Sequence, residues 1–120
     1  MGKYEIVFYC KPNGREPVRE FLDTLPNRLR GEALSDLFIL AEMGPELRMP
    51  HSRHLRQGVF ELRIQADGDS ARIFYFFYQK GKIVATNGFK KKTRKTPVRE
   101  LERAFRYKRD WEKRMQHDNA

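Results

Sequence analysis

The sequence predicts an α+β fold, in which a mostly antiparallel sheet of about four strands carries an N-terminal helical hairpin and a C-terminal helix. Three observations support this prediction. Short segments are rich in β-branched and aromatic residues, longer segments repeat apolar residues at helical spacing, and an Asp-Gly pair marks a hairpin turn. We expect one domain over residues 1–116 and a frayed tail over residues 117–120, because 120 residues suffice for a single hydrophobic core.

The N-terminal half is predicted to hold one strand and two helices. Residues 4–9 have the composition of a strand, and Pro17 suits the start of a short helix. A second helix should end at Gly44, because glycine often follows the last helical turn and Pro45 prevents continuation. The apolar stripes of the two helices are expected to cover a sheet. Residues 46–57 show no period, and neither a helix nor a strand is predicted there.

The C-terminal half is predicted to hold three strands and a long helix. Residues 59–64 alternate between apolar and polar side chains, and residues 71–78 are apolar on both faces, which is typical of a central strand. A turn then leads to a last strand at residues 83–87. The final helix should run from Pro97 to about Met115, with Thr96 as its N-cap.

The net charge of +9 is concentrated in one segment. Ser70–Arg99 contains nine basic residues and no acidic one, whereas the rest of the chain carries equal numbers of the two kinds. A localised excess of this kind implies an acidic partner. We expect two such partners, a nucleic acid and an acidic protein that masks the basic site.

Hairpin geometry predicts where some of these cations meet. A two-residue Asp67-Gly68 loop places Arg63 opposite Arg72, whereas a Gly68-Asp69 loop places Arg63 opposite Phe74 and still keeps both arginines on one face. A two-residue Lys80-Gly81 loop places Phe89 beside Arg72. Opposed like charges cost a few tenths to about 1 kcal/mol unless they are compensated. We interpret the two arginines as an exposed phosphate clamp, with Glu61 on the same face. The alternative is an arginine–glutamate network at the surface.

The segment Gly88–Pro97 extends this basic face. Five of its six side chains from Lys90 to Lys95 are cationic, and the segment leads into the positive end of the last helix. A polyphosphate backbone would relieve the repulsion. The alternative is a solvated, lysine-rich loop.

The order of three motifs resembles the HigB-like, phage-derived branch of the RelE/ParE toxin superfamily. The motifs are Gly58-Val59-Phe60-Glu61-Leu62-Arg63, Ala71-Arg72-Ile73-Phe74-Tyr75, and Gly88-Phe89-Lys90-Lys91-Lys92-Thr93 followed by Thr96-Pro97. The similarity extends over nearly the whole chain. It implies a small RelE-like fold and a cognate antitoxin encoded alongside. In RelE-type members it also implies ribosome-dependent cleavage of mRNA.

Metal-independent RNA cleavage requires proton transfer and stabilisation of a charged phosphorane. Arg63 and Arg72 suit the stabilising role, and Lys90 or Lys91 suits proton transfer because neighbouring cations lower a lysine pKa. Glu61 is a further candidate base. The remaining candidates for RNA contact are Lys92, Arg94, Lys95, Arg56 and His54, of which His54 is also a candidate base. We expect no metal and no other cofactor.

Two other functions stay open at this point. A ParE-type toxin would bind DNA gyrase, and a non-enzymatic module would only bind RNA. Convergence of Arg63, Arg72 and Lys90 favours the nuclease, and the absence of an aromatic base-stacking pattern counts against the module.

The sequence also predicts where the protein acts and which element an antitoxin contacts. A single cysteine, Cys10, and the lack of a signal-like start or an apolar span favour the cytoplasm and argue against membrane contact. The last helix is the expected antitoxin contact, because it carries arginines at helical spacing: Arg99, Arg103, Arg106 and Arg109.

Overall fold

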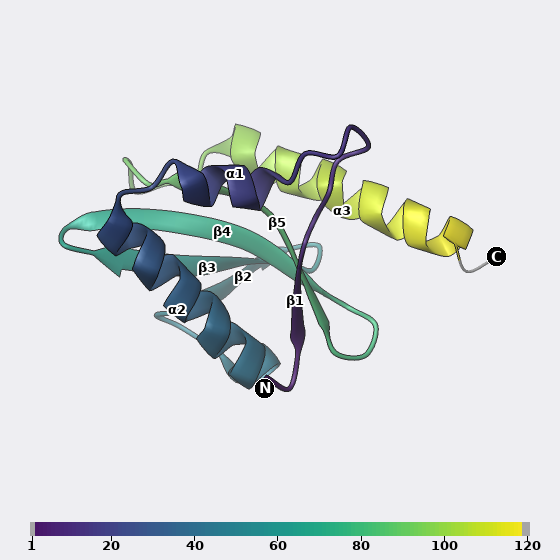
Figure 1. The fold of residues 1–120 in the computed structure, drawn as a ribbon, viewed down its shortest axis with the longest axis horizontal. Coiled ribbons are helices and arrows are strands. Elements are labelled where there is room, and N and C mark those ends of the chain that lie inside the picture. The colour runs from purple at the N-terminus through teal and green to yellow at the C-terminus, as the bar shows by residue number, and fades with distance from the viewer. Residues whose placement is uncertain (1, 119–120) are drawn as a thin grey trace.

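A computed structural model describes residues 2–118 as a five-stranded mixed sheet with two helices on one face and a third on the other (Figure 1). The sheet has the order β1-β5-β4-β3-β2, in which β1 is parallel to β5 and all other neighbours are antiparallel. The α+β class is as predicted, but there are five strands instead of about four. The elements are β1 (Glu5–Phe8), α1 (Pro17–Asp23), α2 (Asn27–Met43), a 3-10 turn η1 (Gly44–Glu46), β2 (Ser52–Arg56), β3 (Val59–Ala66), β4 (Asp69–Tyr78), β5 (Lys82–Lys90) and α3 (Val98–Asp118).

The α1–α2 hairpin covers one face of the sheet, as its apolar spacing predicts. The buried residues of α2 recur every three or four positions and pack in one cluster with β3, β4 and β5: Leu29, Ala33, Leu37 and Leu40. Gly88 of β5 allows α1 to approach closely, since a Cβ at this position would lie 2.5 Å from the ring of Phe21. Gly88, the first residue of the basic segment, is therefore required by packing.

Gly44 ends α2, as predicted, and its conformation explains why. Its φ is +54°, in the region that favours glycine, and a Cβ there would lie 2.2 Å from the ring of Tyr4. A side chain at this position would clash with the segment that leads into β1.

The strand β2 is the element that the periodicity failed to predict. Ser52–Arg56 pairs with β3 at the edge of the sheet, and only Ser52 of its five residues is fully buried. A short edge strand rich in charge lacks an apolar alternation, and such charges discourage pairing with other chains. The sequence of β2 therefore predicts no strand, although the segment pairs with β3.

The register of β3 and β4 is the one that an Asp67-Gly68 loop predicts, and the predicted pairing of Arg72 with Phe89 is confirmed although the β4–β5 loop has a different length. Arg63 lies opposite Arg72, and Arg72 lies opposite Phe89. The β4–β5 loop has three residues instead of two, because Tyr78 pairs with Lys82. A bulge at Thr86 restores the expected pairing, and the buried Thr86 hydroxyl has two acceptors within reach, Asn87 Oδ1 at 2.8 Å and the carbonyl oxygen of Phe74 at 3.3 Å.

The helix α3 covers the other face and is fixed there by a polar contact with the end of β1. The Tyr9 hydroxyl donates to Asp110 Oδ2 at 2.6 Å, and Arg114 donates to the same oxygen and to the carbonyl of Cys10, both at 2.5 Å. The Tyr9 ring also stacks on Tyr107 with centroids 4.6 Å apart.

The helix α3 extends through Asp118, so residues 117 and 118 are helical instead of forming a tail; residues 119–120 lie outside the described part. None of the helices within residues 2–118 has the length and apolar character needed to cross a bilayer.

Replacing Tyr9 by Phe is expected to lower the free energy of unfolding by about 1–2 kcal/mol at neutral pH, since Asp110 loses a hydrogen bond. The Tyr9 hydrogen bond and Arg114 hold the pKa of Asp110 below its usual range, although burial opposes them. A depressed carboxyl pKa stabilises the fold above about pH 4 and ceases to do so as the pH falls through it. The difference between wild type and variant should therefore shrink in acid, as measured by urea unfolding. Tyr107→Phe is the matched control, and an equal loss there would contradict the prediction.

Candidate active site

A buried ion pair lies at the centre of the predicted basic face. Arg72 Nε is 2.6 Å from Glu61 Oε1, and the two side chains are only 3% and 4% exposed. A second nitrogen of Arg72 donates to the carbonyl of Ala71 at 3.0 Å. The expectation of an exposed Arg72 is wrong, because the segment that leads into α3 crosses this end of the sheet. Thr96 of that segment brings its hydroxyl to 3.5 Å from Glu61 Oε2.

Glu61 thus compensates the opposition of two arginines. Burial lowers the pKa of the Arg72 guanidinium, the charge and hydrogen bond of Glu61 raise it, and the positive charges of Arg63 and Arg53 lower it. Removal of either partner would leave a charge in the interior. The pair is consequently part of the framework of the site.

Two exposed or half-buried arginines surround the pair. Arg63 is half-buried, and its Nη1 lies 3.8 Å from the sulfur of Met49. Arg53 of β2 is paired in register with Glu61; its guanidinium lies 3.9 Å from Glu61 Oε2 and its side chain is 54% exposed. Sequence reasoning missed Arg53 because it missed β2. Arg53 and Leu55 are two positions apart, so in an extended segment both side chains lie on one face; this spacing could have indicated that Arg53 belongs to the site.

Of the two lysines predicted to transfer protons, only Lys91 belongs to this cluster. Its amide donates to the carbonyl of Ser70 at 2.8 Å, and its ammonium donates to the carbonyl of Arg94 at 2.6 Å. Burial and the charge of Arg72 lower the pKa of Lys91. Lys90 is the last residue of β5 and is exposed, and it projects to the face opposite that of the buried Phe89. The alternation of side chains along β5 therefore directs Lys90 and Lys91 to opposite faces of the sheet.

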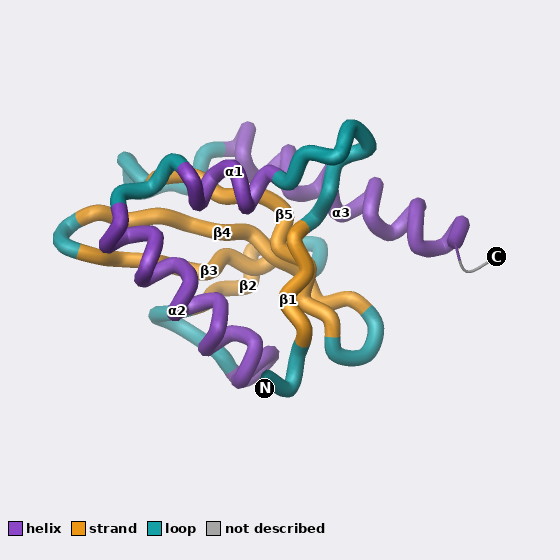
Figure 2. Tube along the Cα trace, viewed as in Figure 1, coloured by secondary structure: helices purple, strands orange, loops and turns teal. Residues whose placement is uncertain are grey.

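The predicted RNA contacts divide into three groups. Figure 2 shows the loop between β5 and α3 at the end of the sheet that carries the β3–β4 turn, and three predicted contacts are exposed on it: Lys92, Arg94 and Lys95. Arg56 lies on the α3 side, where its guanidinium is 5.2 Å from the ring centre of Phe105. His54 lies on the α1–α2 side, packed against Phe60 with ring centroids 4.9 Å apart. The structure therefore separates His54 from the other candidates.

The chemistry that this arrangement supports is binding of a phosphate group. We define the cationic site as Arg53, Arg63 and Lys91, arranged around the Glu61–Arg72 pair. Guanidinium groups offer paired donors suited to phosphate oxygens, and the adjoining lysine-rich loop adds long-range attraction. Within residues 2–118, no three side chains of His, Cys, Asp or Glu lie together in a way that would hold a metal ion.

One family model matches the chain. It is described as phage derived protein Gp49-like (DUF891), and it matches residues 20–109, a range that includes the whole cationic site. No curated protein matches the chain.

Proposed function

Since the chain belongs to the Gp49-like family of phage-derived proteins, a RelE-like family associated with toxin–antitoxin systems, we propose that it is a HigB-like toxin that cleaves mRNA on the ribosome without a metal ion. The single observation that carries the proposal is the convergence of Arg53, Arg63 and Lys91 around the buried Glu61–Arg72 pair. Three chain segments contribute to this convergence, which distinguishes it from a run of surface lysines.

The exposed arginines would bind the scissile phosphate. Attack of the 2′-hydroxyl on phosphorus adds negative charge to the phosphate oxygens, and preorganised donors lower the energy of that state. Arg63 and Arg53 present their guanidinium groups at the rim of the site, where they are partly accessible. Both are fixed at strand positions, which limits the reorganisation needed during the reaction.

Lys91 would donate a proton to the leaving 5′-oxygen. Its ammonium form is the donor, and a lowered pKa makes that form a stronger acid. The hydrogen bond to the carbonyl of Arg94 orients the side chain within the site. Lys90, which we predicted as an equal candidate, is exposed on the other face of the strand and has no role in this proposal.

Glu61 and Arg72 would position the reacting groups without touching the substrate. Both side chains are almost wholly buried, and their charges are already paired at 2.6 Å. Arg72 lies opposite Arg63, and Glu61 lies opposite Arg53, so the pair fixes the strand positions of both exposed arginines. This assigns them a different role from the direct catalysis predicted for them.

Mapping of mRNA 5′ ends after brief induction is the experiment that tests the function. We expect new 5′ ends within coding regions of translated mRNAs, and their loss in the Lys91→Gln variant. A gyrase supercoiling assay on the same protein is run in parallel. Inhibition of supercoiling without new 5′ ends would overturn the proposal in favour of a ParE-type toxin, and RNA binding with neither effect would favour a non-enzymatic module.

A further inference from the structure

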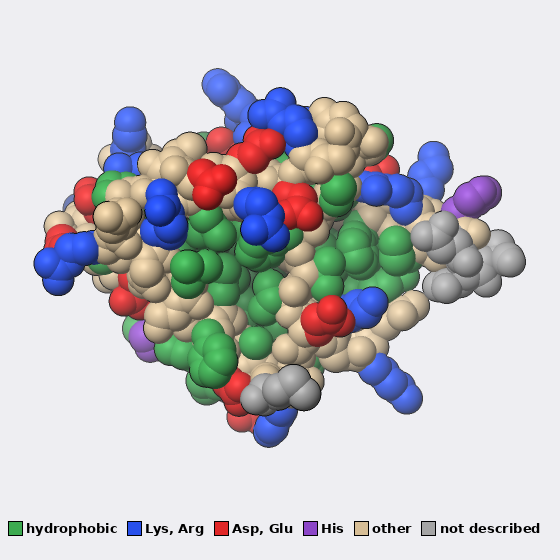
Figure 3. Space-filling view, viewed as in Figure 1, with side chains coloured by type: hydrophobic (Ala, Val, Ile, Leu, Met, Phe, Trp, Pro, Cys, Tyr) green, Lys and Arg blue, Asp and Glu red, His purple; other side chains and the backbone are tan. Residues whose placement is uncertain are grey.

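An exposed apolar surface lies along α2. Of the six large apolar side chains exposed within residues 2–118, four lie on α2: Leu34, Phe38, Ile39 and Met43. Figure 3 shows hydrophobic side chains gathered over α2 and between α2 and β1. Phe38 is 63% exposed, and burial of an aromatic side chain of this size would be strongly favourable. We call the four side chains Leu34, Phe38, Ile39 and Met43 the α2 ridge.

A groove lies on each side of the ridge. The first, of about 560 Å³, is bounded by α2 and by the edge strand β1, whose Ile6 and Phe8 line it together with Leu34 and Phe38. The outer edge of β1 has no neighbouring strand within the described sheet. The second groove, of about 540 Å³, separates α2 from the loop that precedes β2. The ridge is therefore shaped to fit between the side chains of another segment.

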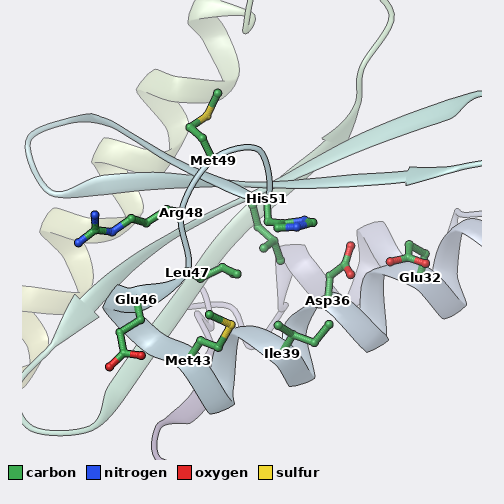
Figure 4. A pocket seen from close by; sticks show the side chains of 10 residues that line it. Glu32, Asp36, Ile39, Met43, Glu46, Leu47, Arg48, Met49 and His51 are labelled. Carbon is green, nitrogen blue, oxygen red and sulfur yellow. The ribbon is translucent and has the colours of Figure 1, made fainter.

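The second groove combines an apolar wall with a carboxylate end. Figure 4 shows Asp36 and Ile39 projecting from α2 toward the loop that carries His51. Glu32 lines the same end, one helical turn before Asp36. Burial, and after it the hydrogen bond and charge of the adjacent Glu32, raise the pKa of Asp36 to about 7. A cationic side chain placed beside Glu32 and Asp36 would pair with their carboxyl groups and favour the charged forms.

The charge of this region is opposite to that of the whole chain. Residues 31–46 contain four acidic residues and no basic one, and three of the four line the second groove together with one arginine, Arg48, in a protein with a net charge of +9. Pairing of two copies through α2 would bring two such acidic segments together, which argues against a symmetric dimer. A partner with apolar side chains flanked by Lys or Arg is complementary in both respects.

We infer that the α2 ridge and its two grooves bind the cognate antitoxin through a segment that carries apolar side chains flanked by Lys or Arg. This inference rests on the proposed function for the existence of an antitoxin. Phe38 and the groove between α2 and β1 contain no residue of the cationic site, so this part of the contact is separate from any acidic segment that masks the site. At the other end of the contact, Asp36 lines a pocket together with Arg63 of the site. Phe38 would be the central anchor, and Glu32 and Asp36 would receive the cationic side chain.

The test measures binding of the product of the small gene adjacent to the gene for this chain. Calorimetric titrations use the full chain carrying Lys91→Gln, which permits its expression. Adding Phe38→Ser should weaken binding at least tenfold, because central aromatic anchors dominate interfaces. Asp36→Lys should also weaken it at least tenfold. Val98→Ser tests the competing contact on α3, the helix whose arginines suggest antitoxin binding, because Val98 is exposed to a similar extent, 65%, at the start of that helix. It should change binding less than twofold if the apolar anchor of the complex is on α2.

A second measurement separates this contact from the toxin activity. In cells, the active chain with Phe38→Ser should arrest growth as the wild type does, but co-expression of the antitoxin should no longer restore growth. Neutralisation of the Phe38→Ser variant, undiminished binding of both α2 variants, or an equal loss with Val98→Ser would overturn the inference. Absence of any complex would also overturn it, whereas the 5′-end mapping reports on the toxin activity independently.

Discussion

Replacing Arg72 by Ala is expected to lower the free energy of unfolding by about 3–5 kcal/mol, because Glu61 would remain buried without its partner. This is a loss comparable to that of a core truncation, and for a chain of this size it approaches the total stability. The measurement is equilibrium unfolding in urea, read by circular dichroism. A loss below about 1 kcal/mol would mean that the pair does not stabilise the fold.

Two further variants separate structure from function at this pair. Arg63→Ala is the matched control, because Arg63 is opposite Arg72 in register but half-buried; we expect it to cost less than about 1 kcal/mol. The double variant Glu61→Leu and Arg72→Met removes both charges together, so most of the stability should return, since apolar residues of similar volume can replace a buried pair. Cleavage activity should stay low in the double variant, because the positions of Arg53 and Arg63 would no longer be fixed. Full recovery of both properties would exclude a positioning role.

The fold was largely predictable because its elements carry strong local patterns. Pro17 and Gly44 mark helix ends that the structure confirms, and the apolar run of β4 marks the central strand. The unpredicted element, β2, is short, charged and at the edge, so its pairing depends on the neighbouring β3 more than on its own composition. Sequence periodicity records burial, and an edge strand of this kind is barely buried.

The candidate site was predictable in its location but not in its depth. The predicted turns place Arg63, Arg72 and Phe89 side by side, as in the structure, although a bulge at Thr86 compensates for a wrong length of the β4–β5 loop. The burial of Glu61 by Thr96 and the loop before α3 could not be predicted in this way, since it depends on the path of a loop that has no regular sequence pattern. The sequence also did not show that Lys90 and Lys91 lie on different faces of the sheet, because β5 extends to Lys90, beyond the predicted last residue. The alternation of strand side chains then decides which lysine faces the site.

Because Lys91 and not Lys90 faces the cationic site, replacement of Lys91 should have the largest effect on activity. Replacing Lys91 by Gln should reduce the single-turnover rate of mRNA cleavage on purified ribosomes by about 10²–10⁴-fold, the usual contribution of a positioned proton donor. The free energy of unfolding should change by less than about 1 kcal/mol, because Lys91 is only partly buried. The wild-type rate should fall as the pH rises through the pKa of Lys91, which lies below its ordinary value of 10.5, and the variant should lose this dependence.

Lys90→Gln is the matched control for this prediction, because it removes the same charge one residue away. Lys90 is exposed and projects to the opposite face of β5, so its loss should reduce the rate by no more than about threefold, through long-range attraction to RNA alone. That small effect should disappear at high salt, whereas the Lys91→Gln defect should persist, since loss of a proton donor is not screened. Equal defects in the two variants at all salt concentrations would mean that the lysine run acts only as a source of positive charge. The cationic site would then bind RNA without supplying the proton for cleavage.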